Sequence, residues 1–460
     1  MGPFYSYINQ VRDWIWGAPT LALLIGTGVY LTFILRGLQF RYLWYGVKQI
    51  FAKRKEGSIG DISHFEALMT SLGGAIGTGA IVGVSTAIAI GGLGALFWMW
   101  VMAFFGMATK YSESLLAVKY REIDKRGEMI GGPMEYMEKG LGKRWMAILF
   151  ATFGSVAAIG TGNLVQVNSI AEAVSSIWFM SPWITGVVLA VITGLVLVGG
   201  VRSIGHFTGV LVPIMSLFYI GGGVIIIFLH IDQVPSAIGM IISSAFHGQA
   251  ATGGFMGASV ITAIQMGVSR GVFSNEAGLG ISSIAAAAAK TDAPGRQAMI
   301  TMTGTLLSTL IVCTITGLVI AVTGVFGQVD ESGKMINGAV MAIGAFNSAI
   351  SGGNYIVSIG LILFAFSTVI AWAYYGEKCF EYLFGEKAVY YYRVLFVVLI
   401  IPGAALDLEL VWAFADISNG LMIIPNLIAL VGLSKVIVSE TRSFIITSDL
   451  ETGKKQHGMA

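Results

Sequence analysis

The chain has 460 residues, of which 55% are hydrophobic and 11% are charged, and its net charge is +2 at pH 7. A soluble domain usually has about 25% charged residues, so this composition excludes a soluble protein and indicates one that crosses a membrane several times. The apolar runs are continuous and about 20 residues or longer, which excludes a β-barrel and predicts an all-α polytopic membrane protein. Cys313 and Cys379 lie in apolar runs without metal-binding spacing, so we expect neither a disulfide nor a zinc site.

Eleven apolar segments are long enough to span the membrane, with ends defined to within several residues. They are residues 18–36, 65–90, 93–120, 146–177, 183–199, 206–231, 256–290, 297–326, 353–384, 389–407 and 409–437. Two stretches between them are too short to span. We expect Gly127–Gly142 to be an amphipathic cytoplasmic loop and Asn337–Ile350 to be an interfacial helix on the outer side, and an ordinary loop is the alternative for both.

Positive charge indicates the orientation of the spans. When the eleven spans alternate in direction, most Lys and Arg residues fall on one side, and the opposite side has Arg12, Lys334 and little else. The first loop on the basic side includes Arg41, Lys48, Lys53, Arg54 and Lys55. The positive-inside rule then predicts an external N-terminus and a cytoplasmic C-terminus. The polar tail after Leu433 is expected to fray.

The second apolar segment contains the glycine-rich stretch Ser71–Ala80 (SLGGAIGTGA). Each glycine inside a helix costs about 1 kcal/mol relative to alanine, so four glycines in ten residues predict a break in the helix. The unpaired backbone groups of a broken helix are tolerated within a membrane only where they face a polar cavity. The alternative is that these small residues allow close helix packing.

The seventh segment contains a second stretch of this kind, Arg270–Gly280 (RGVFSNEAGLG), in which glycines frame Ser274, Asn275 and Glu276. Charged groups near mid-membrane cost about 2.5–3.5 kcal/mol on insertion, so they face a cavity or pair with each other. A structural pair between Arg270 and Glu276 is the alternative to a binding role. This second break makes the binding interpretation of the first one stronger.

The two breaks lie five spans apart, and this odd offset makes the corresponding helices run in opposite directions. Such an offset is typical of an inverted-topology repeat, with two discontinuous helices and a binding site between the halves. We expect one transmembrane domain over residues 1–460. It divides into an extra N-terminal helix and cytoplasmic loop (18–60), a first repeat (65–231), a second repeat (256–437) and a cytoplasmic tail (438–460).

Broken helices provide complementary partial charges. The free N–H groups at the start of a half-helix suit a carboxylate, and the carbonyl oxygens at the end of one suit an ammonium group or Na⁺. Two such breaks can therefore hold an amino acid and a cation without a charged side chain.

Four motifs resemble those of the alanine/glycine:cation symporter family. They are Ser71–Ala80, Gly94–Trp100 (GALFWMW), Gly106–Glu113 (GMATKYSE) and Gly271–Gly280 (GVFSNEAGLG). The similarity extends from about residue 60 to residue 440. It implies the LeuT-type 5+5 inverted repeat of the amino-acid–polyamine–organocation superfamily, and uptake of alanine and glycine driven by Na⁺ or, in some members, by H⁺.

The resemblance implies how the substrate binds. Its carboxylate would meet amides near Thr78 and Gly79, and its ammonium group would meet carbonyls near Ala75 and Phe273. The predicted substrate site consists of Ala75, Gly77, Thr78, Gly79, Gln166, Phe273, Ser274, Asn275 and Trp372.

Two parts of this site have structural alternatives. Trp372 would leave room only for a hydrogen or methyl side chain and so exclude leucine, or it is a packing aromatic or interfacial anchor. Among the intramembrane amides Asn163, Gln166 and Asn168, at least one could reach the substrate, or all three join helices. Lys110 is expected to form an intracellular structural pair with Glu113.

The resemblance also implies one Na⁺ site between the first broken helix and residues 353–384. Its ligands would be the carbonyl oxygens of Gly73, Ile76 and Phe364 and the hydroxyls of Ser367 and Thr368. Alternatively, both hydroxyls bond back to carbonyls of the preceding turn. Symporters with a second Na⁺ have an Asn just after the first break, where this chain has Ala80, so we expect one ion.

The resulting prediction is a secondary active symporter that imports alanine or glycine with Na⁺. We expect a monomer in the cell membrane, in contact with lipid and without a nucleic-acid partner. The chain has no catalytic constellation, so we do not expect an enzyme. A proton-coupled transporter that uses Glu276 is the alternative, and a passive channel is less well supported because the chain has no filter motif or charge ring.

Overall fold

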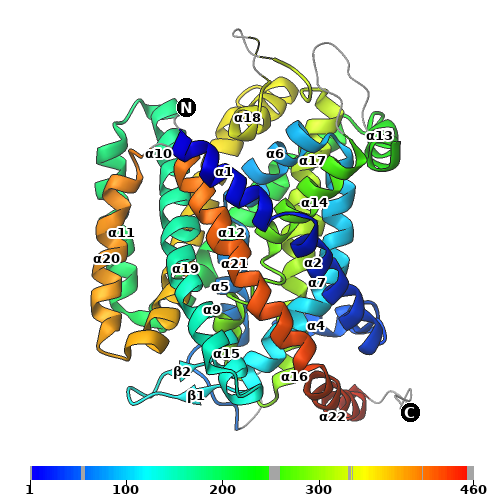
Figure 1. The fold of residues 1–460 in the computed structure, drawn as a ribbon. Coiled ribbons are helices and arrows are strands. Elements are labelled where there is room, and N and C mark those ends of the chain that lie inside the picture. The colour runs from blue at the N-terminus through cyan, green and yellow to red at the C-terminus, as the bar shows by residue number, and fades with distance from the viewer. Residues whose placement is uncertain are drawn as a thin grey trace.

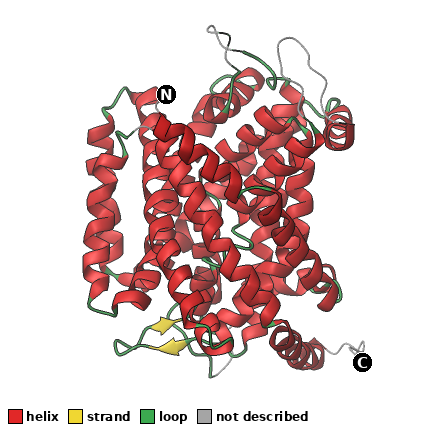
Figure 2. Ribbon diagram, viewed as in Figure 1, coloured by secondary structure: helices red, strands yellow, loops and turns green. Residues whose placement is uncertain are grey.

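In a computed structural model of the protein, the structure describes residues 3–52, 57–247, 259–329, 333, 335–406 and 408–452. The described residues form a bundle of long helices with one small hairpin at one end (Figure 1). Figure 2 shows that helices dominate the molecule and that short loops interrupt two of them near its centre. Six of the described helices are long and apolar enough to cross a membrane, and further apolar helices are shorter.

Four helices precede the first broken helix. They are α1 (Pro3–Ile15), α2 (Ala18–Ile34), α3 (Leu38–Arg41) and α4 (Leu43–Ile50). Helix α1 lies across α21 (Leu408–Gly432) in Figure 1. The two helices approach closely at Gly420, where an added Cβ would lie 2.2 Å from Cγ2 of Ile15.

The first half of the bundle follows. Its elements are α5 (His64–Ala75), η1 (Thr78–Ala80), α6 (Val82–Gly91), α7 (Gly94–Lys119), β1 (Glu122–Ile123), β2 (Met129–Ile130), α8 (Pro133–Glu135), η2 (Tyr136–Gly140), α9 (Arg144–Ala157), η3 (Ala158–Leu164), α10 (Val165–Trp178), α11 (Pro182–Val198) and α12 (Gly200–Leu229). Strands β1 and β2 pair antiparallel, with Glu122 opposite Ile130. The segments η2 and η3 are π-helical.

The second half contains the other broken helix. Its elements are α13 (Val234–His247), α14 (Val260–Asn275), α15 (Ser283–Ala287), α16 (Pro294–Thr305), η4 (Leu306–Cys313), α17 (Thr314–Thr323), α18 (Gly338–Ala349), α19 (Gly353–Phe384), α20 (Ala388–Gly403), α21 and α22 (Ser434–Thr452). Segment η4 is π-helical and joins α16 to α17 in one continuous helix.

Each predicted apolar segment corresponds to a helix or an interrupted helix, and several other described helices were missed. Helices α3 and α4 lie where a cytoplasmic loop was expected. Helices α1 and α13 were not predicted, and α22 is helical where a fraying tail was expected. The expected loop Gly127–Gly142 contains β2, α8 and η2, because Gly132 adopts a positive φ of 141° that lets the chain turn into α8. Within Asn337–Ile350, α18 confirms the helix, whereas its interfacial position stays a prediction.

Some predictions fall on residues outside the described part of the chain. These are Lys53, Arg54, Lys55 and Lys334 in the charge argument, residues 256–258 of the second repeat, and residues 453–460 of the tail.

Both predicted breaks are present, and local chemistry positions them. Ser63 begins α5 with a capping box, in which its Oγ accepts from the Glu66 amide at 3.2 Å and its own amide donates to Glu66 Oε2 at 2.8 Å. The helix ends at Ala75, and Gly77 has non-helical backbone angles, with φ −107° and ψ −147°. Helix α14 ends at Asn275, and Glu276 takes the left-handed conformation that stops a helix.

Candidate functional site

The two breaks enclose a small cavity at the centre of the bundle. Its lining comes from both breaks, from η3 and α10, and from α19 and α21: Gly74, Ala75, Gly77, Gly79, Thr161, Gln166, Phe273, Leu279, Thr368, Trp372 and Asn419. Six of the nine predicted substrate residues are among them. The cavity measures about 10 Å³, which is about the space of one water molecule, so an amino acid must widen it by moving side chains.

Gln166 forms hydrogen bonds with the polar groups of Thr78 in the first break. The Thr78 amide donates to Gln166 Oε1 at 3.2 Å, and Gln166 Nε2 donates to Thr78 Oγ1 at 3.2 Å. The same Nε2 donates to the Thr161 carbonyl at 3.0 Å. The amide oxygen of Gln166 therefore occupies the position at the Thr78 N–H where a substrate carboxylate is predicted, and a ligand would exchange with it.

Two aromatic side chains, Trp372 and Phe273, form walls of the cavity. Trp372 is buried, and its indole N–H donates to the Gly74 carbonyl at 3.3 Å. Gly162 permits this position, since an added Cβ there would lie 2.2 Å from the Trp372 Cβ. On the other wall, a Cβ at Gly79 would lie 2.9 Å from the Phe273 ring. The absent side chains at these glycines let aromatic rings approach the broken backbone.

The side chains of Ser274 and Asn275 contact Thr309 on η4. The Ser274 hydroxyl lies 2.7 Å from the hydroxyl of Thr309 on η4, and Asn275 Nδ2 donates to the same oxygen at 3.2 Å. Asn275 Oδ1 accepts from the Ala277 amide at 2.9 Å. Neither residue is among the described residues that line the cavity. This geometry suits bracing of the second break against η4 better than direct contact with a ligand.

The predicted Na⁺ ligands gather beside the cavity. The Gly73 carbonyl accepts from Ser367 Oγ at 3.1 Å and from Thr368 Oγ1 at 2.8 Å. Both hydroxyls also lie within reach of the Phe364 carbonyl, at 2.8 and 3.1 Å. Back-bonding within α19 and contact with the first break therefore coexist, and four of the five predicted oxygens form one cluster. The structure describes no hydrogen bond from these hydroxyls to the Ile76 carbonyl.

A cation would fit this oxygen cluster chemically. Neutral carbonyl and hydroxyl oxygens suit Na⁺, and rotation of the two hydroxyls would turn their lone pairs towards the ion. Space is tight, because a Cβ at Gly77 would lie 2.4 Å from Thr368 Oγ1. Thr368 belongs to the cluster and also lines the cavity. Among the described residues, no group of three His, Cys, Asp or Glu side chains could hold a metal ion.

The charged residues near the second break form different pairs from those expected. Lys110 Nζ lies 3.7 Å from Glu276 Oε2 and donates to the Asn275 carbonyl at 2.9 Å and to Ser282. Glu113 instead accepts from the amides of Gly278 and Gly280, at 2.9 and 3.0 Å. The expected Lys110–Glu113 pair is therefore wrong, because both side chains leave α7 to bind the loop after α14.

The alternative pairing of Arg270 with Glu276 is also wrong. Arg270 Nη2 lies 3.6 Å from Asp416 Oδ2 on α21. Glu276, in the left-handed position after α14, directs its carboxylate to Lys110 instead. Although Arg270 and Glu276 are close in sequence, the end of α14 between them directs the two side chains to different partners.

The three intramembrane amides have different roles. Asn163 donates to the Phe396 carbonyl at 2.7 Å and Asn168 to the Leu406 carbonyl at 2.7 Å, so both join helices. Only Gln166 reaches the cavity among these three. Sequence reasoning missed Thr161 and Asn419, which hydrogen-bond each other at 2.9 Å. Thr161 lies in η3, and π-helical segments often mark functional sites but leave no clear sequence signal.

Comparison with known proteins was made by sequence and by structure. The sequence model of the sodium:alanine symporter family matches residues 1–458. The sodium/alanine symporter AgcS of Methanococcus maripaludis is 52% identical, over 96% of this chain and 97% of that protein. The probable sodium/glutamine symporter GlnT of Bacillus subtilis is 36% identical, over 97% of this chain and 91% of that protein.

A solved structure shows the same fold. The crystal structure of MhsT in complex with L-phenylalanine matches with a TM-score of 0.59 and 13% identity, over 84% of this chain and 93% of that one. The predicted LeuT-type architecture is thereby confirmed. Together the comparisons identify a multi-pass membrane transporter of the cation-coupled amino-acid symporter class, which is not an enzyme.

Proposed function

We propose that this chain, which belongs to the sodium:alanine symporter family, carries alanine or glycine into the cell together with one Na⁺. The observation that supports this most is the meeting of the two breaks: residues from both line one cavity, and the oxygen cluster of Gly73, Ser367 and Thr368 adjoins it.

Thr368 would lie against both proposed ligands, the Na⁺ ion and the amino acid. Its hydroxyl contacts the Gly73 carbonyl at 2.8 Å and its side chain lines the cavity. An ion among these oxygens would hold the end of α5 against α19 and so order the backbone that meets the amino acid. Na⁺ should then raise the affinity for alanine, and alanine should raise the affinity for Na⁺ by the same factor.

The walls of the cavity account for a preference for small side chains. Trp372 is fixed by its bond to the Gly74 carbonyl and by the close backbone of Gly162. Because the cavity holds about one water molecule, any amino acid must displace side chains to enter. Alanine and glycine need the least displacement, and leucine needs much more.

Transport would proceed by alternating access, with the bundle that contains both breaks rocking against the other helices. We assign the N-terminus to the outside and the C-terminus to the cytoplasm of a cell-membrane protein that works as a monomer. The predicted ligands Thr78 and Gly79 would receive the carboxylate after Gln166 releases the Thr78 amide. In this proposal Ala75 and Phe273 carbonyls face the ammonium group, and Ile76 completes the Na⁺ ligands.

The test is equilibrium binding of L-alanine to the purified protein in Na⁺ and, separately, in K⁺. Binding in Na⁺ that disappears in K⁺ is expected. Equal binding in both salts would contradict Na⁺ coupling. A lack of binding in either would contradict alanine as the substrate, and glycine and other small amino acids would then be measured in the same assay.

A proton-coupled transporter that uses Glu276 is the second candidate. The observation that favours it is that both carboxylate oxygens of Glu276 are buried and have no hydrogen-bond partner among the described residues. The observation against it is Lys110, 3.7 Å away, which already compensates the negative charge. Alanine uptake driven by a pH gradient in Na⁺-free medium distinguishes the two candidates.

A further inference from the structure

Asn419 on α21 has a polar atom that the contacts described so far do not use. The residue is 1% exposed and lines the cavity between the two breaks. Its amide nitrogen donates to the Thr161 hydroxyl at 2.9 Å, whereas its oxygen Oδ1 has no hydrogen-bond partner among the described residues. Within the described lining of the cavity, no other side chain has a buried nitrogen or oxygen without a partner.

A buried oxygen of this kind needs an explanation. It has lost its contact with water, and almost all buried polar groups in folded proteins are hydrogen-bonded. The joining of helices accounts for only half of the carboxamide, the half that bonds Thr161 on η3. The other half belongs to a residue that lines the cavity, so a donor on a bound ligand would complete its hydrogen bonding.

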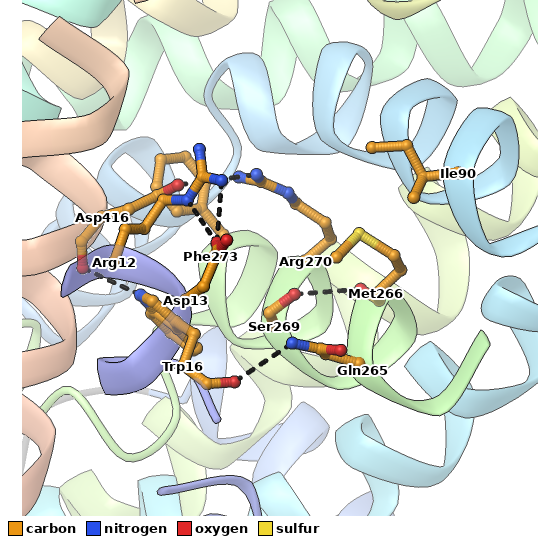
Figure 3. A pocket seen from close by; sticks show the side chains of 10 residues that line it. All are labelled: Arg12, Asp13, Trp16, Ile90, Gln265, Met266, Ser269, Arg270, Phe273 and Asp416. Atoms are coloured by element: carbon orange, nitrogen blue, oxygen red, sulfur yellow. Dashed lines mark hydrogen bonds and ion pairs between the residues drawn. The ribbon is translucent and has the colours of Figure 1, made fainter. Parts of the chain in front are cut away.

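Helix α1 and the residue after it fix the backbone on both sides of Asn419. The Trp16 indole N–H donates to the carbonyl of Asp416, one turn earlier in α21, at 2.9 Å (Figure 3). Directly after Asn419, an added Cβ at Gly420 would lie 2.2 Å from Cγ2 of Ile15. A carboxamide on such a fixed turn discriminates between ligands better than a mobile one.

The pair of Asn419 and Thr161 lies beside Trp372, the residue proposed to limit the size of the ligand side chain. Thr161 precedes Gly162, and an added Cβ at Gly162 would lie 2.2 Å from the Trp372 Cβ. Trp372 and both members of the pair line the same small cavity. The free oxygen therefore belongs to the part of the cavity that a ligand side chain would enter.

The same pair is separated from the proposed position of the ligand carboxylate. The carboxylate is proposed to meet the Thr78 amide, which donates to Gln166 Oε1 at 3.2 Å. Gln166 Nε2 in turn donates to the Thr161 carbonyl at 3.0 Å. Gln166 thus stands between the carboxylate position and the pair, so the carboxylate is not the partner of Asn419.

A hydroxyl group suits the free half of this carboxamide. It donates to the oxygen, and it accepts from the amide N–H if the carboxamide turns over, so it pairs with either end. The methyl group of alanine would lie beside the oxygen and leave it without a donor. A carboxylate side chain would accept only, and would bring an unpaired charge into the cavity.

We propose that the cavity also accepts L-serine, and that Asn419 determines this specificity by hydrogen-bonding the serine hydroxyl. Thr161 is a positioning residue, since its hydroxyl orients the carboxamide. This inference rests on the proposed function, because serine takes the same cavity and the same backbone contacts as alanine. Serine is larger than alanine by one oxygen atom, and the new hydrogen bond offsets the extra displacement of side chains.

The experiment compares serine with a ligand of nearly the same shape. L-2-Aminobutyrate has a methyl group where serine has its hydroxyl, so a cavity that selects by size alone binds the two equally. Binding of each radiolabelled amino acid, and of L-alanine, is measured on the purified protein in Na⁺. Serine is expected to bind about fivefold or more tightly than 2-aminobutyrate, because only serine provides the hydrogen bond.

Variants test whether the Asn419 carboxamide recognises the hydroxyl. Asn419→Leu keeps a side chain of similar size without polar atoms, and should abolish the preference for serine over 2-aminobutyrate. A merely structural role would instead lower the binding of all three ligands together. If Asn419→Leu fails to fold, Thr161→Val is the milder variant and should lower the preference about threefold by releasing the carboxamide.

Asn168→Leu is the matched control. Asn168 is also an amide within an apolar helix, but it bonds the Leu406 carbonyl at 2.7 Å and is not among the described residues that line the cavity. The preference for serine should be unchanged in this variant. A preference that falls equally in Asn168→Leu and Asn419→Leu would mean that it does not depend on the cavity residue.

The outcomes separate this inference from the proposed function. Binding of alanine, with serine no tighter than 2-aminobutyrate, would overturn the inference and leave the proposed function intact. A serine preference that survives Asn419→Leu would remove Asn419 as the residue that recognises the hydroxyl. Serine binding without alanine binding would support the hydroxyl site and contradict alanine as the substrate, and binding of neither would contradict both.

Discussion

The cavity between the two breaks (the inner cavity) and a pocket of about 120 Å³ lined by Arg12, Asp13, Arg270 and Asp416 (the outer pocket) share Phe273 as a wall and differ in their chemistry. The inner cavity is lined by glycine backbone, amides and hydroxyls, and it is almost filled by protein atoms. The outer pocket has charged side chains and much more space. The ends of broken helices provide partial charges that need no counter-ion. Fully charged side chains, such as those that line the outer pocket, must be paired with opposite charges.

This difference implies a division of labour. The charged side chains of the outer pocket can attract a charged solute but select little by its size. A tight cavity walled by Trp372 discriminates by size. Substitutions in the inner cavity should therefore change transport and selectivity strongly, and substitutions outside its lining should change them less.

The largest effect is expected at Gly77. An added Cβ would lie 2.4 Å from Thr368 Oγ1 and 3.1 Å from Gln166 Oε1, so Gly77→Ala would overpack both the oxygen cluster and the cavity. Such overpacking costs about 1–3 kcal/mol, which corresponds to a loss of about 5- to 150-fold in Na⁺-dependent alanine uptake.

The matched control is Gly221→Ala in α12, where an added Cβ meets no atom within 4 Å. That variant should transport normally, since alanine favours the helix. Normal uptake by Gly77→Ala, at equal protein in the membrane, would mean that the first break does not bind the substrate.

The next effect concerns Na⁺. Ser367→Ala combined with Thr368→Val removes two hydroxyls that face the Gly73 carbonyl, and should raise the Na⁺ concentration for half-maximal uptake about tenfold or more. Thr323→Val in α17 is the control, because its hydroxyl bonds only within its own helix. An unchanged Na⁺ dependence of uptake would remove the assignment of the oxygen cluster.

A smaller effect, a change of selectivity, is expected at Trp372. Trp372→Phe should enlarge the cavity and raise the uptake of valine and leucine relative to alanine by about tenfold, since one or two extra methylene groups are worth about 1–3 kcal/mol. Trp183→Phe, exposed on α11, is the control. Competition of unlabelled leucine with labelled alanine measures the change, and a continued exclusion of leucine would make Trp372 a packing residue.

The sequence predicted the breaks well and the charge pairs poorly, for a physical reason. Glycine clusters such as Ser71–Ala80 act through the local backbone, so their effect can be read from adjacent residues. The partner of Glu276 depends on the left-handed turn that follows α14 and on the packing of α7, neither of which spacing reveals. For the same reason Arg270 was compared with the wrong carboxylate.

The helices that prediction missed show a related limit. Helix α22 contains many polar residues, and α1 begins the chain with mixed composition, so neither has the long apolar run that identifies a span. Their positions depend on tertiary contacts. Trp16 at the end of α1 is placed by its bond to Asp416, a residue 400 positions away.

The smallest effect is expected at Asn275, although the sequence placed it beside the substrate. Its side chain bonds Thr309 and the Ala277 amide and is not among the described residues that line the cavity, so we expect it to act by shaping the second break. Asn275→Ala should lower thermal stability by about 1 kcal/mol and alanine affinity only about twofold.

A double-mutant cycle tests this distinction between bracing and binding. If Asn275 braces α14 against η4, its effect on stability should be smaller in a Thr309→Val background, because the shared hydrogen bond is already absent and only the bond to the Ala277 amide remains. The affinity for alanine should change little in all four proteins. A loss of affinity much greater than twofold in Asn275→Ala, with unchanged stability, would instead place its amide in contact with the substrate and extend the inner site towards η4.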